Sequence, residues 1–122
     1  MDNPFALIIE DDTKSATIFS EALRQAEFET EIILDGYIAL ERLTATIPAV
    51  VLLDLHLPYA SGIDILQHIR ANQRLAKTRV IIVTADLFQA EALRDEVDLV
   101  LLKPISFSKL RDLAPRFRPS SN

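Results

Sequence analysis

The stretch AVVLLD, residues 49–54, places five aliphatic residues in a row directly before a carboxylate. An apolar run without polar alternation is typical of a strand buried on both faces, as at the centre of a parallel sheet covered by helices. Open α/β sheets bind their ligands beyond the carboxyl ends of such strands. Asp54 is therefore predicted to lie at the functional edge of a sheet.

Three more apolar runs also end in polar or charged residues. Segments between the runs have helical spacing, with apolar or small residues at i, i+3, i+4 and i+7 in residues 19–26 and 62–69. The alternation predicts the order βαβαβαβαβα, a parallel sheet with helices on both faces. The three runs are ALII at 6–9 before Glu10, Asp11 and Asp12, VIIV at 80–83 before Thr84, and LVLL at 99–102 before Lys103 and Pro104.

Composition limits the architecture and the chemistry. The chain has 122 residues, 49% of them hydrophobic, which predicts one domain over residues 1–122. The absence of cysteine excludes disulfides, thiol catalysis and cysteine metal sites. No apolar run approaches the roughly 20 residues of a membrane span. The amino-terminal sequence also lacks the basic flank of a signal peptide. A cytoplasmic protein without a membrane partner is expected.

Charge is distributed unevenly. The net charge is −5, but residues 103–122 hold five cations against one acid, a net of +4. Five cations without interleaved aromatic residues make a poor nucleic-acid surface, so direct nucleic-acid binding is not expected. Pro115 should limit the last helix to about residues 106–114. The prediction is a core over about residues 5–114 and a solvated, frayed tail over 115–122.

The polar residues at the strand ends suggest a phosphate and metal site. Carboxylates of Glu10, Asp11 and Asp54 on neighbouring strands would repel one another unless a cation lay among them, and Mg²⁺ suits an all-oxygen set. Thr84 and Lys103 offer a hydroxyl and an ammonium, which are good donors to phosphoryl oxygens. Asp12, in contrast, is placed to cap the first helix.

Five motifs occur in one order along the chain: the acidic cluster after the first run, Asp54, Pro58 with Gly62, Thr84-Ala85, and Lys103-Pro104. With these motifs, residues 5–114 resemble the receiver domains of two-component response regulators. The resemblance implies a doubly wound, flavodoxin-like sheet of five parallel strands in the order 2-1-3-4-5. It also implies a cis peptide bond between Lys103 and Pro104.

The same resemblance implies a function. Asp54 would accept a phosphoryl group from the phosphohistidine of a histidine kinase or phosphotransfer protein, in a phosphorelay that regulates an output domain or partner protein. Glu10, Asp11, Asp54 and the backbone carbonyl of His56 would hold Mg²⁺, with Glu10 acting through water. The imidazole of His56 is expected to be exposed. Such a domain is a signalling module rather than a turnover enzyme.

Two departures from the receiver pattern concern the output. Val100 occupies the position of the usual aromatic residue, and the stretch from Thr84 to Lys103 is shorter than usual by about one helical turn. A short or irregular fourth helix is expected. The alternative is therefore a phosphorylation-independent interaction module that uses this altered face. A phosphohydrolase and a dinucleotide-binding protein fit less well, because His56 replaces a second aspartate and only Gly36 and Gly62 are glycines.

Overall fold

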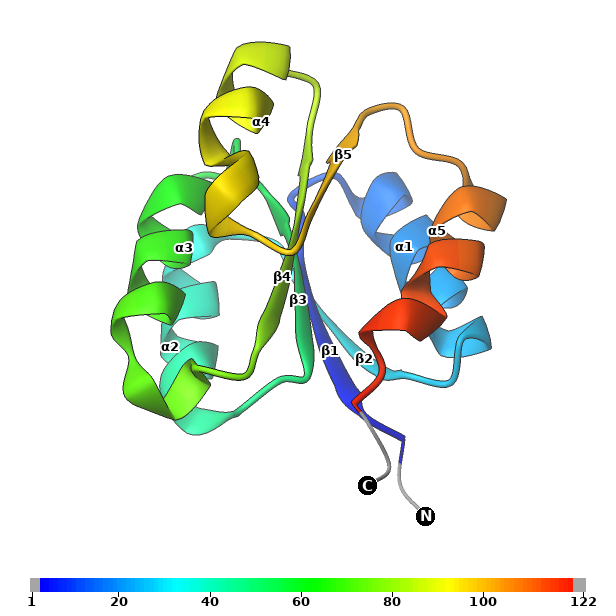
Figure 1. Ribbon diagram of the computed structural model, residues 1–122, viewed down its shortest axis with the longest axis horizontal. Helices are drawn as coiled ribbons and strands as arrows, with labels where there is room; N and C mark the ends of the chain where they lie inside the picture. The colour runs from blue at the N-terminus through cyan, green and yellow to red at the C-terminus, as the bar shows by residue number, and fades with distance from the viewer. Residues whose placement is uncertain (1–2, 120–122) are drawn as a thin grey trace.

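A computed structural model describes residues 3–119, and these form a five-stranded parallel sheet in the order β2-β1-β3-β4-β5 (Figure 1). The predicted fold and strand order are confirmed. The strands are β1 (Phe5–Ile9), β2 (Glu29–Ile33), β3 (Val50–Asp54), β4 (Arg79–Thr84) and β5 (Leu99–Leu102). The helices are α1 (Thr13–Gln25), α2 (Gly36–Ala45), α3 (Gly62–Ala71), α4 (Leu87–Leu93) and α5 (Phe107–Leu113).

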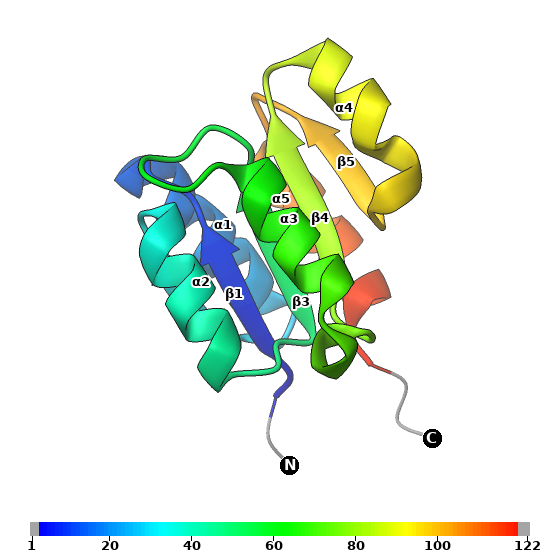
Figure 2. The same cartoon turned by 90° about the vertical axis from the view of Figure 1, so that its left-hand side faces the viewer.

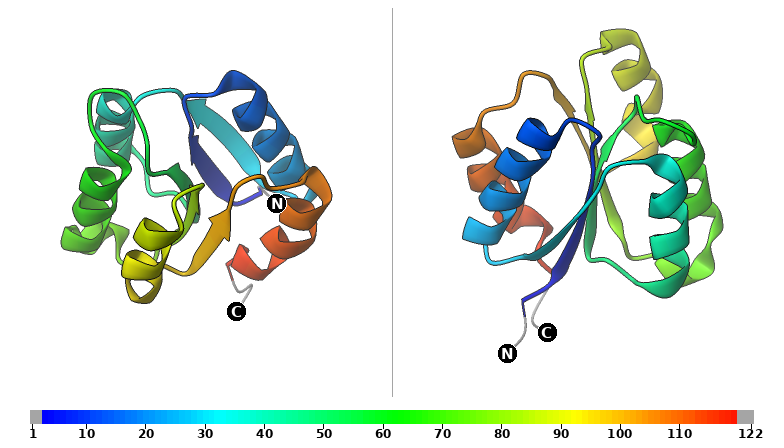
Figure 3. Two further views of the ribbon diagram at one scale, coloured as in Figure 1. Left: turned by 90° about the horizontal axis from the view of Figure 1, so that it is seen from above. Right: turned by 180° about the vertical axis from the view of Figure 1, so that it is seen from behind.

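Helices cover both faces of the sheet. Helices α1 and α5 lie on one face, and α2, α3 and α4 lie on the other (Figures 1 and 3). Each face has its own apolar core, since alternate residues of the central strands point to opposite sides. Every residue of AVVLL except the first is buried, as expected for a central parallel strand.

The strand register gathers the predicted site residues at one edge. Ile9 pairs with Leu53, Asp54 with Val83, and Thr84 with Leu102. Because all five strands run in the same direction, their carboxyl ends share that edge, seen above the arrowheads in Figure 2. Residues 10, 54, 84 and 103 are thus neighbours in space although they are far apart in sequence.

A short polar side chain caps the amino-terminal end of each of the five α-helices. Asp12 caps α1, as the sequence predicts, by accepting a hydrogen bond from the Ser15 nitrogen at 3.0 Å. Ser106 caps α5 in the same way, and its side chain accepts a hydrogen bond from the Lys109 nitrogen at 3.1 Å. The caps at the other helices are Asp35 for α2, Ser61 for α3 and Asp86 for α4.

The loop that follows β3 is docked against the start of α2. The Gly36 nitrogen donates to the Pro58 carbonyl at 3.1 Å, and a side chain at Gly36 would collide with the backbone of Ala60. Glycine is therefore required here by close approach of two backbone segments. This contact holds the chain just beyond Asp54 against a neighbouring element.

The fourth helix is short, as predicted. Helix α4 has seven residues and is followed by a 3-10 turn at Arg94–Glu96. Val100, on the adjacent strand, is partly buried against the core of the α2, α3 and α4 face. The aromatic ring expected here from the resemblance is thus replaced by a small aliphatic packing residue.

The carboxyl-terminal end differs from expectation. Helix α5 ends at Leu113, before Pro115, but the chain continues as a 3-10 helix, η3 (Ala114–Phe117). Phe117 is buried in the core under α1 and α5, so the predicted frayed tail is wrong for this part of the chain. The physical reason is the apolar area of Phe117, which is more stable out of water. Residues 120–122 of the predicted tail lie outside the described residues.

Within residues 3–119, no helix has both the length and the apolar character needed to cross a membrane.

Candidate functional site

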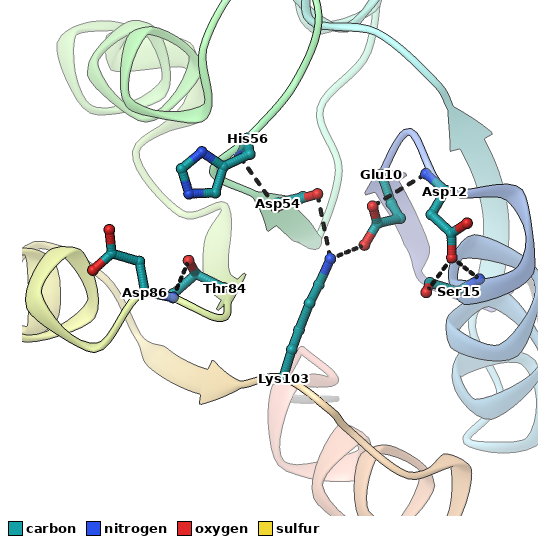
Figure 4. A network of polar contacts seen from close by, with 8 residues as sticks. All are labelled: Glu10, Asp12, Ser15, Asp54, His56, Thr84, Asp86 and Lys103. Atoms are coloured by element: carbon teal, nitrogen blue, oxygen red, sulfur yellow. Dashed lines mark hydrogen bonds and ion pairs between the residues drawn. The ribbon is translucent and has the colours of Figure 1, made fainter.

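Four strands contribute one polar side chain each to a compact site (Figure 4). Glu10 follows β1, Asp54 ends β3, Thr84 ends β4 and Lys103 follows β5. Glu10 and Asp54 are only 2% and 5% exposed, and Thr84 is fully buried. Two carboxylates at this depth require a compensating charge or hydrogen bonds.

The ammonium of Lys103 provides that charge. Its Nζ lies 2.8 Å from Oε1 of Glu10 and 3.4 Å from Oδ2 of Asp54. Backbone amides satisfy the remaining oxygens: the His56 nitrogen donates to Oδ1 of Asp54 at 3.1 Å, and the Asp12 nitrogen donates to Oε2 of Glu10 at 3.2 Å. The cis peptide bond predicted between Lys103 and Pro104 is present.

Burial and like charge alter the protonation of the site. Burial, reinforced by the hydrogen bond and the negative charge of Asp54, raises the pKa of Glu10 to about 7, although Lys103 acts in the opposite direction. For Lys103, burial alone would lower the pKa, but Glu10 and Asp54 outweigh it and the pKa is raised. The lysine therefore stays charged while the acids repel each other.

The acids fit a hard divalent cation. Glu10, Asp11 and Asp54 each bring a carboxylate oxygen to within 4.8 Å of the other two, and Asp11 is the exposed member. An all-oxygen set with a solvent-facing side suits Mg²⁺, which retains water ligands. The residue set expected for Mg²⁺ is thus close together, while its roles as ligands stay predictions.

Asp12 and His56 lie as the sequence analysis expects. The carboxylate of Asp12 accepts hydrogen bonds from the nitrogen and the hydroxyl of Ser15, at 3.0 and 2.6 Å, and these bonds lower the pKa of Asp12. It belongs to the helix cap rather than to the acidic group. The imidazole of His56 is exposed, and its backbone nitrogen contacts Asp54.

Thr84 is turned toward α4 rather than toward the carboxylates. Its Oγ1 accepts a hydrogen bond from the Asp86 nitrogen at 3.0 Å (Figure 4). The Asp86 carboxylate in turn caps α4 by accepting from the nitrogens of Phe88 and Gln89. Among the described residues, the Thr84 hydroxyl makes no hydrogen bond with Asp54 or Lys103.

Asp86 was missed by the analysis of the sequence. Its signal is an aspartate three residues before Gln89 and just ahead of the helical segment, which is the pattern of an amino-terminal cap. Because the same residue donates to Thr84 and caps α4, it links the site directly to the fourth helix.

Comparison with known proteins agrees with this geometry. The profile of the family described as "Response regulator receiver domain" matches residues 6–114. The chain is 30% identical to the probable methanogenesis regulatory protein FilR2 of Methanothrix harundinacea, over 90% of this chain and 79% of that protein. It is 34% identical to the transcriptional regulatory protein CitB of Klebsiella pneumoniae, over 96% of this chain and 51% of that one.

A third relative bears on partners. The DNA-binding response regulator MtrA of Mycobacterium tuberculosis is 31% identical over 92% of this chain and 48% of its own. The chain spans about half the length of MtrA and of CitB. A relative named as DNA-binding does not fit the expected lack of nucleic-acid binding, and that expectation is not supported.

Solved structures show the same arrangement. The receiver domain of the Francisella response regulator 1452 superposes with a TM-score of 0.81 at 28% identity, over 94% of this chain and 96% of that one. The chemotaxis response regulator CheY4 of Vibrio cholerae superposes with a TM-score of 0.85 at 19% identity, over 94% and 98%, and shows the fold alone. From the family match and these relatives, the chain belongs to the receiver domains of two-component response regulators.

Proposed function

We propose that Asp54 accepts a phosphoryl group from the phosphohistidine of a histidine kinase or phosphotransfer protein, and that the phosphorylated domain regulates an output. The observation that supports this most is the ammonium of Lys103 between two buried carboxylates, at 2.8 Å from Glu10 and 3.4 Å from Asp54. A cation held at this edge is positioned to interact with oxygens that arrive on Asp54.

In the proposed transfer, a carboxylate oxygen of Asp54 attacks the phosphorus and forms an acyl phosphate. The bond between phosphorus and the imidazole nitrogen of the donor breaks, and its electron pair stays on that nitrogen. The His56 nitrogen, 3.1 Å from Oδ1, orients the carboxylate during the attack. The domain modifies its own residue and does not turn over a small substrate.

Charge at the transferring group requires stabilisation. Glu10, Asp11, Asp54 and the His56 carbonyl would hold Mg²⁺, and the ion would neutralise charge on the phosphoryl oxygens. Lys103 would exchange one of its carboxylate contacts for a phosphoryl oxygen. Thr84 can join it, because its Oγ1 is the acceptor from Asp86 and its own hydrogen remains to be donated.

The proposal is tested by mass spectrometry of the intact chain after incubation with acetyl phosphate and Mg²⁺. The wild type should gain one phosphoryl group, and a chelator should prevent the gain. Asp54→Asn keeps the shape of the side chain and removes the nucleophile, so it should stay unmodified. Equal labelling of Asp54→Asn would show that another residue is the acceptor.

The cytoplasmic location stays a prediction.

A second candidate, a phosphorylation-independent interaction module, is favoured by one observation. Phe88 and Leu87, at the start of the short α4, are 87% and 51% exposed. Exposed apolar side chains next to one another are typical of a contact surface. This candidate predicts identical partner binding by the wild type and Asp54→Asn with and without acetyl phosphate, whereas the first predicts a difference for the wild type alone.

A further inference from the structure

A groove of about 770 Å³ lies at the edge of the sheet where the strands begin, opposite Asp54. It is lined by residues at or just before the starts of three strands: Phe5, Ala49 and Arg79. In Figure 2 this edge lies at the bottom of the sheet, where β1 starts and the carboxyl-terminal 3-10 helix η3 ends. Its size is that of many small-molecule sites, which range over roughly 300–1,000 Å³.

The charge of the groove is opposite to that of the whole chain. Four cations line it against the carboxylate of Asp98, while the protein has a net charge of −5. Arg70 pairs with Asp98 at 3.2 Å, and Arg118 pairs with Glu27 at 2.8 Å. The other two cations, Lys77 and Arg79, form no ion pair with any of residues 3–119. They can neutralise an anionic ligand.

The groove also offers apolar and planar surfaces. The Arg79 guanidinium lies 6.0 Å from the ring centroid of the buried Phe117, at the outer limit of a cation–π contact. Ile47, which is 59% exposed, and Pro48 line the same groove. Guanidinium planes stack on flat rings, so Arg79 suits a planar ligand as well as a charged one.

We propose that this groove binds a nucleotide, with the base against Arg79 and the apolar wall of Ile47 and Pro48 and a phosphate group near Lys77. A ligand with a flat ring and a negative group uses both kinds of surface, whereas a simple anion would use only the cations. The site includes Arg118 from the basic carboxyl-terminal stretch, which the phosphorylation site does not use. It goes beyond phosphorylation of Asp54 and does not depend on it.

The test is a titration of the full chain with ADP, without Mg²⁺, followed by amide chemical shifts. We expect a dissociation constant below about 1 mM, with the largest shifts in residues 47–49 and 76–79. Lys77→Glu should weaken binding about tenfold, because a hydrogen bond to a charged group contributes on that scale, and Arg79→Ala should weaken it about tenfold through loss of the surface on which the base stacks. Lys109→Glu on α5 is the matched control, since it makes the same charge change outside the groove and should leave the affinity unchanged.

Several results would overturn the proposal. These are an absence of shifts up to millimolar ADP, shifts centred on residues 10, 54 and 103, or equal weakening by Lys109→Glu. Pyrophosphate binding as tightly as ADP would show a site for anions alone. The amide spectrum of Lys77→Glu should match that of the wild type outside residues 76–79, which verifies its folding and keeps this test separate from the one at Asp54.

Discussion

Lys103 is held more closely by Glu10 than by Asp54, with Nζ at 2.8 Å from the first carboxylate and 3.4 Å from the second. In this arrangement the ammonium neutralises both Glu10, one of the acids proposed to hold Mg²⁺, and Asp54, the proposed phosphoacceptor. Phosphorylation would add charge on the Asp54 side and draw the ammonium toward it. The distances from Lys103 Nζ to Glu10 and to Asp54 should therefore differ between the unphosphorylated and the phosphorylated domain.

Lys103→Ala should permit some phosphorylation of Asp54 but weaken the conformational response. The ammonium is the strongest donor to the new phosphoryl group, and its loss removes about 1.5–3 kcal/mol from the stabilisation of the phosphorylated arrangement. Amide chemical shifts of residues 84–103, with and without beryllofluoride, measure the response. A response equal to that of the wild type would refute the role of Lys103.

Asp11→Ala and Asp12→Ala should affect different properties of the protein. Asp11 belongs to the acidic group, whereas Asp12 accepts two hydrogen bonds from Ser15 at the start of α1. Asp11→Ala should greatly weaken Mg²⁺ binding, and Asp12→Ala should mainly lower the free energy of unfolding. Metal titrations and urea unfolding of both variants provide the comparison. A larger metal defect in Asp12→Ala would shift the ligand assignment by one residue.

The sheet and the grouping of site residues could be predicted because both follow from local patterns. Unbroken apolar runs mark buried parallel strands, and parallel strands bring their carboxyl ends together. Glu10, Asp54, Thr84 and Lys103 each follow or end such a run, so the patterns place them at one edge, and the resemblance to receivers supplied the strand order that makes them neighbours. The cap at Asp12 is likewise local, since its partner is three residues away.

Other features depend on contacts that no short pattern reveals. Arg70 on α3 donates to the carbonyl of Glu96, 26 residues later, and pairs with Asp98. Phe117 is buried only because α1 and α5 provide a core for it. The link from Thr84 to α4 through Asp86 depends on a side-chain direction. Such interactions could be identified only once the helices and strands were placed relative to one another.

Asp98→Ala should lower the free energy of unfolding by about 1–3 kcal/mol, because a buried donor left without a partner carries a cost of that size. Oδ2 of Asp98 accepts from the nitrogen of the buried Val80 at 2.7 Å and also pairs with Arg70 at 3.2 Å. Asp98→Asn retains an acceptor for Val80 and should lose less. Urea unfolding of the two variants decides between them, and an equal loss would assign the effect to the charge alone.

The ion pair of Glu31 with Arg42 should make stability depend on pH. Two hydrogen bonds of 2.7 Å from the guanidinium lower the pKa of Glu31 below its ordinary value of 4.5. A lowered pKa means that the contribution is complete above about pH 4.5 and is lost as the pH falls through the folded-state pKa. Glu31→Gln should therefore destabilise the protein at pH 7 and much less at the acid limit. The same loss at both pH values would contradict this.

A phosphoryl group on Asp54 should produce only a weak conformational change in α4. A ligand shifts an equilibrium between two conformations only by its difference in affinity for them. Val100 supplies neither the packing area nor the hydroxyl of a tyrosine. A conformation in which Thr84 has moved toward Asp54 therefore gains little stabilisation from β5. The 3.0 Å hydrogen bond from the Asp86 nitrogen also ties Thr84 to the start of α4 and opposes its movement toward Asp54.

We therefore expect little dimerisation through the exposed start of α4 when Asp54 carries a phosphoryl mimic. Sedimentation velocity with and without beryllofluoride should show a monomer in both conditions, because Leu87 and Phe88 are already exposed without phosphorylation and Val100 adds little packing to a rearranged state. Asp54→Asn is the control for effects of the reagent itself. A shift from monomer to dimer in the wild type that Phe88→Ala abolishes would show that this face is a full phosphorylation-dependent switch despite Val100.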